Sequence, residues 1–370
     1  MIPLFKVFMS GQATQLASEV LQSGYIGQGQ KVEEFESVLS DYMNHPVVTT
    51  NSGTSALHLA LHMAKGDKSD IEVLTTPLTC TATNWPILAN GLSLKWVDID
   101  PTTMNMDMDD LRSKITEKTK IIMVVHWGGY PVDLDELEKI KDETDEKYGF
   151  RPIVIEDCAH AFGGEYDGKK IGTTHGNFCA FSFQAIKHLT SIDGGMLLMP
   201  EEYRSRAKLM RWYGIDRESN SKDFRCEADV KEWGFKFHMN DVCASVGIAN
   251  MRHIVWNVSV HQRNASFYDE NLSDVDGATL LKRDPRIKSS YWIYSMLVED
   301  REGFMAKMKE CDIMVSQVHE RNDIHTCVGE YQSDLPQLDS VIGKLVSIPV
   351  GWWVTEEDTQ YIVDCIKSGW

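Results

Sequence analysis

The stretch Ile121-Ile122-Met123-Val124-Val125-His126 is apolar at consecutive positions and is followed closely by the glycine pair Gly128-Gly129. A strand with one solvated face alternates apolar and polar residues, whereas a strand covered on both faces of a parallel sheet does not. The stretch therefore predicts a buried strand of a mainly parallel sheet. Six further runs of the same character flank it, at residues 46–50, 72–76, 94–98, 153–157, 178–182 and 195–199.

Helical patterns separate these runs. Residues 55–64 follow the capping candidates Ser52 and Thr54, and residues 133–147 are strongly charged, as a solvent-facing helix is. Strands that alternate with helices predict an α/β fold with a mainly parallel central sheet.

The pattern changes near residue 250. Long helical segments over 241–267 lead to apolar runs at 291–298 and 313–315, and an amphipathic helix over 356–367 closes the chain. We therefore expect a large domain over residues 1–250 and a smaller C-terminal α+β domain over residues 251–370.

The charge balance excludes one broad class of function. The 370 residues hold 37 Lys and Arg against 55 Asp and Glu, for a net charge of −18. Proteins that bind nucleic acid need clustered cations to neutralise phosphates, and the chain has no such block. A few local cations can still favour an anionic small molecule in a pocket.

The cysteines and the chain start indicate the compartment. The eight cysteines form no CxxC pair and no zinc-type spacing, so we expect free thiols, no metal site and a reducing environment. No signal-peptide pattern opens the chain, and no apolar run approaches the ~20 residues that cross a bilayer. We expect a cytoplasmic protein without a membrane partner.

Two chemically suggestive residues follow strand ends. Asp157 closes the run 153–157, and Lys187 lies in the short uncharged segment Ser182-Phe183-Gln184-Ala185-Ile186-Lys187. Ligands gather at the carboxyl ends of parallel strands. A lysine amine and a carboxylate are what pyridoxal phosphate (PLP) needs, for a Schiff base and for a protonated pyridine nitrogen.

The loop Ser52-Gly53-Thr54-Ser55 falls at another strand end and opens a helix. Backbone N–H groups, small hydroxyls and the helix dipole favour a phosphate there, although an ordinary capped turn has the same residues. Two interpretations also stay open for His160, a cofactor contact or a core histidine, and for Ser182, a phosphate ligand or a structural residue.

These motifs together resemble the DegT/StrS family of PLP-dependent sugar aminotransferases. The resemblance extends over nearly the whole chain and rests on Ile2-Pro3-Leu4, Gly27-Gln28-Gly29, Ser52 to Leu57, Val125 to Gly129, Glu156 to Ala161, Ser182 to Lys187, Asp193-Gly194-Gly195 and Arg211 to Gly214. It implies a PLP-dependent transferase of fold type I that works as a homodimer with active sites at the subunit interface.

The resemblance also implies roles for single residues. Lys187 corresponds to the Schiff-base lysine, Asp157 to the partner of the pyridine nitrogen, and His160 to the residue near the cofactor's 3-oxygen. The phosphate ligands are expected at Gly53, Thr54, Ser55 and Ser182.

The chain departs from the family pattern at two places. Lys236 replaces an asparagine that relatives send to the neighbouring subunit's phosphate site, and a lysine binds phosphate only as a point charge. Cys80 stands where some relatives place an aromatic ring over the cofactor. We still assign Cys80 and Lys236 to cofactor binding, and we assign Trp127 to substrate binding.

The implied reaction moves an amino group from L-glutamate to a keto-sugar, such as a nucleotide-linked 3- or 4-keto-6-deoxyhexose. A free keto-sugar acid or a cyclitol is an alternative acceptor. A PLP-dependent dehydratase is another alternative, but that branch replaces the lysine with histidine; a non-catalytic PLP-binding protein is the last. In the segment 320–326, Arg321 and His325 are candidate sugar ligands, and a plain surface loop is the competing interpretation.

Overall fold

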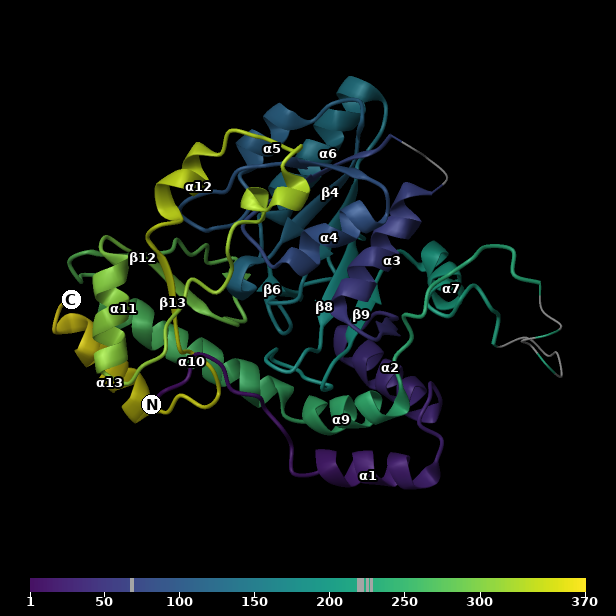
Figure 1. Ribbon diagram of the computed structural model, residues 1–370, viewed down its shortest axis with the longest axis horizontal. Helices are drawn as coiled ribbons and strands as arrows, with labels where there is room; N and C mark the ends of the chain where they lie inside the picture. Colours follow the sequence, from purple (N-terminus) through teal and green to yellow (C-terminus); the bar gives the residue numbers. More distant parts are fainter. Residues whose placement is uncertain (67–69, 218–222, 224–225, 227–228) are drawn as a thin grey trace.

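The computed structural model describes residues 1–66, 70–217, 223, 226 and 229–370. A seven-stranded sheet forms its centre, with the order β1-β9-β8-β5-β4-β2-β3 (Figure 1). Its strands are β1 (Val48–Thr50), β2 (Glu72–Thr75), β3 (Ser93–Trp96), β4 (Thr119–Val125), β5 (Ile153–Asp157), β8 (Phe178–Ser182) and β9 (Gly195–Leu198). Each coincides with a predicted apolar run. Only β9 is antiparallel to its neighbours in this sheet, so the mainly parallel α/β fold is confirmed.

Both faces of the sheet are buried, as the unbroken apolar runs predict. In β4, Ile122 and Val124 belong to one core cluster with Phe35, whereas Met123 belongs to a second cluster with Leu57. The helices that cover the two faces are α2 (Gln30–Met43), α3 (Gly53–Lys65), α4 (Thr81–Ala89), α5 (Met108–Lys114), α6 (Leu134–Tyr148), α7 (Glu201–Met210) and α9 (Asp241–Met251). The helix α1 (Ala13–Ser23) packs on the outer side of α9.

The C-terminal part has its own sheet and its own core. The strands β10 (Ala278–Leu280), β12 (Tyr294–Val298) and β13 (Leu345–Ile348) form an antiparallel sheet. The third core cluster joins it to the helices α11 (Arg301–Glu310) and α13 (Glu356–Lys367). The remaining elements are α12 (Pro336–Val341), the small sheet of β6 (Glu165–Tyr166), β7 (Lys169–Lys170) and β11 (Ile287–Lys288), and three 3₁₀ turns at Trp127–Gly129, Asn322–Ile324 and Thr326–Val328.

The helix α10 (Ile254–Leu272) belongs to both parts of the molecule. Ile254 and Val258 at its start pack in the core of the large sheet, and Tyr268 and Leu272 at its end pack in the C-terminal core. Figure 1 shows α10 running from α9 toward α13, near which both chain ends lie. The division at residues 250 and 251 stays a prediction. Among the helices of the described residues, none combines the length and the apolar composition that crossing a bilayer requires.

The apolar run at 313–315 forms no strand. Ile313 makes only an isolated bridge to Ile2, and the chain bends where Asp312 and Val318 adopt left-handed backbone at φ 59° and 72°. A strand cannot continue through residues in that conformation.

Strand register brings several chain segments to one edge of the large sheet. Asp157 pairs with Val125 of β4 and with Ala180 of β8, and Gly195 of β9 pairs with both Ser182 and Thr50. The carboxyl ends of β1, β5 and β8 therefore meet at this edge, where open α/β sheets bind ligands.

A buried hydrogen-bonded pair, His126 and Glu156, lies directly behind this edge. His126 Nε2 lies 3.0 Å from Glu156 Oε2, and Asn177 donates to Glu156 Oε1 at 2.7 Å. Burial alone would raise the pKa of Glu156, but these hydrogen bonds outweigh it and hold that pKa below its usual value. The other ring nitrogen of His126 accepts from the Val132 N–H, so both nitrogens are engaged within the protein.

We predict that Glu156→Ala lowers the free energy of unfolding by about 3–5 kcal/mol, because it leaves His126 and Asn177 buried without their acceptor. Urea unfolding monitored by circular dichroism measures the change. The control is Glu146→Gln, on the exposed face of α6, for which we expect less than about 0.5 kcal/mol. Equal effects for the two variants would contradict a structural role for Glu156.

Candidate active site

Lys187 follows β8 in the loop that returns to β9, and its amine lies in a desolvated place. Lys187 Nζ lies 3.5 Å from the ring centre of Trp292. The residue is half-buried by accessible surface, but protein surrounds its amine densely. Burial therefore lowers the pKa of Lys187 from 10.5 to about 8, and the negative charge of Asp157 opposes that change. An amine with this pKa is available as a nucleophile and as a proton acceptor near neutral pH.

Asp157 ends β5 with its carboxylate held from two sides. Its Oδ2 accepts from the Thr83 hydroxyl at 2.7 Å, and its Oδ1 accepts from the Ala159 N–H at 3.0 Å. Thr83 in turn lies 2.8 Å from the Thr79 hydroxyl. Burial raises the pKa of Asp157, while these hydrogen bonds and Lys187 lower it. The carboxylate is thus fixed in position in a place that favours a nearby positive charge.

Aromatic rings surround the amine. The His160 ring stacks on Trp292 with centroids 3.9 Å apart, and His319 lies parallel to His160 at 5.5 Å. Burial, followed by the Lys187 charge, lowers the pKa of His160 well below its usual value. Its Nδ1 is buried and finds no partner among the described atoms. His160 is therefore a neutral ring with one nitrogen left for a ligand. Its burial is that of a core histidine, and its unpartnered nitrogen is available for a cofactor contact.

The start of α3 and the end of β8 make a tight cradle. A Cβ atom on Gly53 would lie 2.8 Å from the Cβ of Ser182, and one on Gly195 would lie 2.6 Å from the Ser52 carbonyl oxygen. Only glycine fits at these two positions. Ser52 caps the helix by accepting from the Ser55 N–H. The N–H groups of Gly53 and Thr54 precede the first intrahelical bond, so they can bind an anion at the positive end of the helix dipole.

The predicted phosphate ligands differ in availability. The Ser55 hydroxyl donates to Asn51 Oδ1 at 2.7 Å and lies 2.9 Å from Ser52 Oγ, so local contacts already engage it. Thr54 is exposed, and the Ser182 hydroxyl accepts from the Gln184 N–H at 3.3 Å. Gly53, Thr54 and Ser182 therefore offer more to a phosphate than the Ser55 side chain does.

The two departures from the family pattern both lie beside the cluster. Cys80 occupies the N-cap position of α4, and its thiol interacts electrostatically with the Lys187 amine. Lys236 is exposed, and its carbonyl accepts from the Asn51 side chain at 3.1 Å. Asn51 directly precedes Ser52, so the segment around Lys236 borders the cradle within the same chain.

The loop residues predicted to bind sugar have partners of their own. Arg321 pairs with Asp323 at 2.7 Å and also with Asp339. His325 packs edge-on against Trp85 with centroids 5.8 Å apart. Arg321 is thus neutralised within the protein, which leaves it little charge for a substrate.

The loop nevertheless docks close to Asp157. Asn322 is buried, and its amide donates to the Thr79 carbonyl at 2.7 Å. The same side chain accepts from Asn84 at 2.9 Å. Because Thr79 is the residue that contacts Thr83, the segment 320–326 forms a wall of the site.

Trp127 is buried at 2% exposure, and its indole N–H donates to the Ser295 hydroxyl at 3.2 Å. Its ring lies edge-on to His160 and to His319, with centroids 6.5 and 5.9 Å away. Trp127 therefore packs roughly perpendicular to both histidine rings.

Sequence reasoning missed three residues of this cluster. Trp292 lies in an apolar run that predicts an ordinary strand, and His319 lies in a segment without any motif. Thr83 lies in the first turn of α4, whereas Thr79 precedes the N-cap residue Cys80, so helical spacing does not predict the contact between their hydroxyls.

The residues present fit PLP. The cradle at Gly53 suits its phosphate, Asp157 suits its protonated ring nitrogen, and Lys187 suits its aldehyde. The unpartnered Nδ1 of His160 offers a hydrogen bond beside them.

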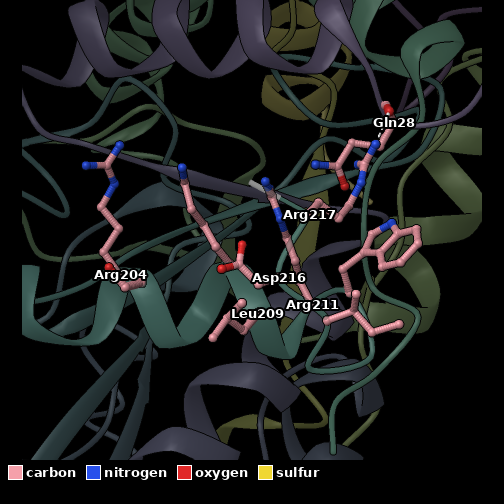
Figure 2. Close-up of a pocket in the computed structure, with 10 residues that line it drawn as sticks. Gln28, Arg204, Leu209, Arg211, Asp216 and Arg217 are labelled. Carbon is pink, nitrogen blue, oxygen red and sulfur yellow. Dashed lines mark hydrogen bonds between the residues drawn. The ribbon is translucent and has the colours of Figure 1, made fainter. Parts of the chain in front are cut away.

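A separate basic cavity of about 290 Å³ lies next to α7. Figure 2 shows Arg204, Arg211 and Arg217 around it together with Gln28. Arg211 is buried and pairs with Glu36 at 2.5 Å. Four cations and one acid line this cavity in a chain of strongly negative charge, namely Arg204, Lys208, Arg211, Arg217 and Asp216.

Known proteins resemble this chain over nearly its whole length. Residues 9–367 match the DegT/DnrJ/EryC1/StrS aminotransferase family. The chain is 50% identical to AtS13 from Actinomadura melliaura, covering 100% of this chain and 99% of that one, with a TM-score of 0.97. It is 45% identical to the sugar aminotransferase CalS13 from Micromonospora echinospora, with full coverage of both chains and a TM-score of 0.97.

A curated relative agrees with these structures. The chain is 32% identical to the UDP-4-amino-4,6-dideoxy-N-acetyl-beta-L-altrosamine transaminase of Campylobacter jejuni, over 95% of this chain and 93% of the relative. With a lysine, a carboxylate and a phosphate cradle at one sheet edge, and with this match over nearly its full length, the chain belongs to the DegT/DnrJ/EryC1/StrS family of PLP-dependent sugar aminotransferases.

Proposed function

We propose that the protein transfers an amino group from L-glutamate to a nucleotide-linked 3- or 4-keto-6-deoxyhexose. The observation that carries this proposal is the desolvated amine of Lys187, held beside Asp157 and the cradle at Gly53. Its identity as lysine favours amination over the removal of a sugar hydroxyl. PLP, when bound, supplies an electron sink for the carbon that loses a proton.

Lys187 has two tasks in this proposal. Its neutral Nζ holds the cofactor by a covalent bond in the resting enzyme, and after release it carries a proton to and from the reacting carbon. Asp157 keeps a positive charge on the ring nitrogen in place, and the aromatic ring of Trp292 excludes water from the amine. The cradle at Gly53 and Ser182 anchors the phosphate.

The nucleotide-linked form of the sugar draws support from the comparisons, because the Campylobacter jejuni relative is named for a UDP-linked sugar. The cavity beside α7 carries no argument for it, since Arg204 and Arg211 in its lining already pair with Glu201 and Glu36.

We also propose a homodimer. Tyr25 and Ile26 expose 85% and 50% of their surface, and Val255 and Trp256 at the start of α10 expose 71% and 50%. Each of these two pairs is exposed apolar surface, and such surface favours burial by a second copy. Lys236, which is exposed, would lie near a phosphate at such an interface.

The substrate is tested by a panel of acceptors after loading with PLP and L-glutamate. The panel holds dTDP-4-keto-6-deoxyglucose, UDP-4-keto-6-deoxy-N-acetylglucosamine, the corresponding free sugars and a keto-cyclitol. We expect one molecule of 2-oxoglutarate per amino-sugar nucleotide, measured by mass spectrometry. Turnover of only free sugars or cyclitols would overturn the nucleotide-linked proposal, loss of a hydroxyl would identify a dehydratase, and no 2-oxoglutarate would leave a PLP-binding protein.

We predict that Lys187→Ala abolishes both covalent retention of PLP and amino transfer, since no other described amine lies in the cluster. Borohydride reduction followed by peptide mass mapping checks the attachment, and 2-oxoglutarate release checks turnover. Lys169→Ala, at an exposed lysine of β7, should match the unaltered protein. Substantial turnover by Lys187→Ala would contradict the assignment.

We predict that cofactor-free protein takes up PLP at a rate that rises with pH and levels off above about 8. Burial lowers the pKa of Lys187 to that value, so the reactive neutral amine accumulates above it. Because the Asp157 charge raises this pKa, Asp157→Asn should move the midpoint to lower pH. Stopped-flow absorbance measures both rates.

The control for this shift is Asp145→Asn, at an exposed acid of α6, which should leave the midpoint in place. A midpoint near the ordinary lysine value of 10.5 would contradict the desolvated amine.

We predict twice the mass of one chain by light scattering coupled to size exclusion. Replacing Tyr25 and Ile26 by Ser should shift the protein toward monomer by removing apolar contact area. A wild-type monomer at micromolar concentration would contradict the dimer.

A further inference from the structure

The start of the chain packs against the tryptophan beside the reactive amine. The Phe5 ring stacks on the Trp292 ring with centroids 5.0 Å apart and planes 24° from parallel. The same Trp292 ring stacks on His160 at 3.9 Å, and its centre lies 3.5 Å from the Lys187 amine. Phe5 is therefore separated from the amine by a single ring, although the two residues lie far apart in the chain.

Hydrogen bonds fix the backbone that leads to Phe5. Ile2 exchanges two backbone hydrogen bonds with the residues on either side of Ile313, at 2.8 and 2.9 Å. The indole N–H of Trp353 donates to the Pro3 carbonyl at 2.8 Å. The segment 2–5 is thus attached to the C-terminal part of the molecule, and this attachment determines where the Phe5 ring lies.

Phe5 lies at the border between Trp292 and solvent. Trp292 is only 3% exposed, whereas Phe5, which packs against the same core cluster, is half-buried. The indole N–H of Trp292 is held by the Ile186 carbonyl at 2.9 Å, so that edge of the ring is fixed by the lysine loop itself. Aromatic pairs prefer an offset stack, so Phe5 restricts the position of the rest of the ring.

The N-terminal segment acts on the amine without adding a charge. The described titratable groups that interact with the Lys187 amine belong to other segments and are Asp157, Cys80, His160, His188 and His319. Burial lowers the pKa of each of these three histidines, so they are neutral near pH 7. Lys6 lies over the Trp352 ring at 5.4 Å, and the Met1 amine lies 3.6 Å from an aspartate carboxylate. Phe5 can therefore influence Lys187 only through the exclusion of water.

Exclusion of water is the effect that dominates the chemistry of this amine. Burial lowers the pKa of Lys187 from 10.5 to about 8, and the charges of Asp157 and Cys80 oppose that change. If the Trp292 ring moves away from the amine, water takes its place and again stabilises the charged form. Contacts that hold the ring in place therefore keep the amine neutral and nucleophilic at lower pH.

We propose that Phe5 is a positioning residue for Lys187, which acts through its stack on Trp292 and keeps water away from the amine that holds the cofactor. This inference rests on the role proposed for Lys187 in amino transfer. It makes the N-terminal segment 2–5 a part of the active site.

The test measures the pH at which Lys187 becomes reactive in the full-length, cofactor-free protein. Competitive acetylation with a trace of acetic anhydride, followed by peptide mass spectrometry, gives the midpoint for this one lysine without PLP. Phe5→Ala should raise the midpoint by about 0.5 pH unit or more, because water then reaches the amine and favours its charged form. The pH dependence of PLP uptake, followed by stopped-flow absorbance, should shift in the same direction.

Two variants at the same position separate the ring from its volume. Phe5→Tyr keeps the stacked ring, so its midpoint should stay within about 0.2 pH unit of the unaltered protein. Phe5→Leu leaves a smaller gap than Phe5→Ala and should give an intermediate shift, which also provides a reading if Phe5→Ala does not fold. Circular dichroism of the same samples reports folding.

Phe8→Ala is the matched control in the same segment. The Phe8 ring lies against His253 at 5.4 Å and against Trp352 at 5.3 Å, and no contact joins it to Trp292 among the described aromatic pairs. We expect its loss to leave the Lys187 midpoint unchanged.

A double variant tests the route of the effect. Trp292→Leu alone should raise the Lys187 midpoint. Adding Phe5→Ala to Trp292→Leu should then change it by less than about 0.2 pH unit, because the ring through which Phe5 acts is gone.

The other outcomes overturn the inference in distinguishable ways. An unchanged Lys187 midpoint in folded Phe5→Ala would show that Phe5 does not protect the amine. An equal shift in Phe8→Ala would show that the N-terminal segment acts through the fold, and additive shifts in the double variant would show that Trp292 is not the route. Protein that shows the expected shifts but transfers no amino group would overturn the proposed function alone.

Discussion

The desolvation of one amine is the constraint on which the site depends. Removal of water lowers the pKa of Lys187, and the charge of Asp157 raises it. Since the two effects oppose each other, the result depends on how completely water is excluded and on where the carboxylate stands. Trp292 excludes water beside the amine, and the end of β5 fixes the carboxylate.

The supporting contacts come from segments far apart in the chain. The Trp292 indole donates to the Ile186 carbonyl at 2.9 Å, and its ring stacks on Phe5 at 5.0 Å. On the other side, His188 directly after the lysine donates to the Ser290 carbonyl at 2.9 Å. The loop that carries the reactive amine is thus tied to the segment 290–292 that precedes β12, so burial of Lys187 and placement of Trp292 depend on each other.

Short sequence patterns predicted those features of the structure that depend on residues close together in the chain. Apolar runs predicted each strand of the large sheet, because burial on both faces leaves a direct trace in the residues themselves. The placement of Asp157 and Lys187 at strand ends followed from the same runs. The antiparallel direction of β9 did not, because strand pairing depends on contacts that no window of sequence contains.

The same difference between short-range patterns and contacts of distant segments explains which site residues the sequence could predict. Trp292 and His319 reach Lys187 only through the packing of the C-terminal part on the sheet edge, and their own segments look like an ordinary strand and loop. Arg321 has the composition of a substrate ligand, but Asp339, eighteen residues further on, neutralises it in the folded chain. Motif matching found the residues that PLP chemistry requires, and it could not find the aromatic residues that pack around Lys187.

The helix α10 contacts both the loop that carries Lys187 and the segment that carries Trp292. Its 19 residues span about 28 Å and are rooted in two hydrophobic cores, one at each end. Between these ends Asn257 donates to the carbonyl of His188 at 2.8 Å, and His261 lies 2.8 Å from the carbonyl of Tyr291. The helix therefore holds both the lysine loop and the segment that carries Trp292. A rotation of the C-terminal part relative to the large sheet would disturb these contacts on both sides of the amine at once.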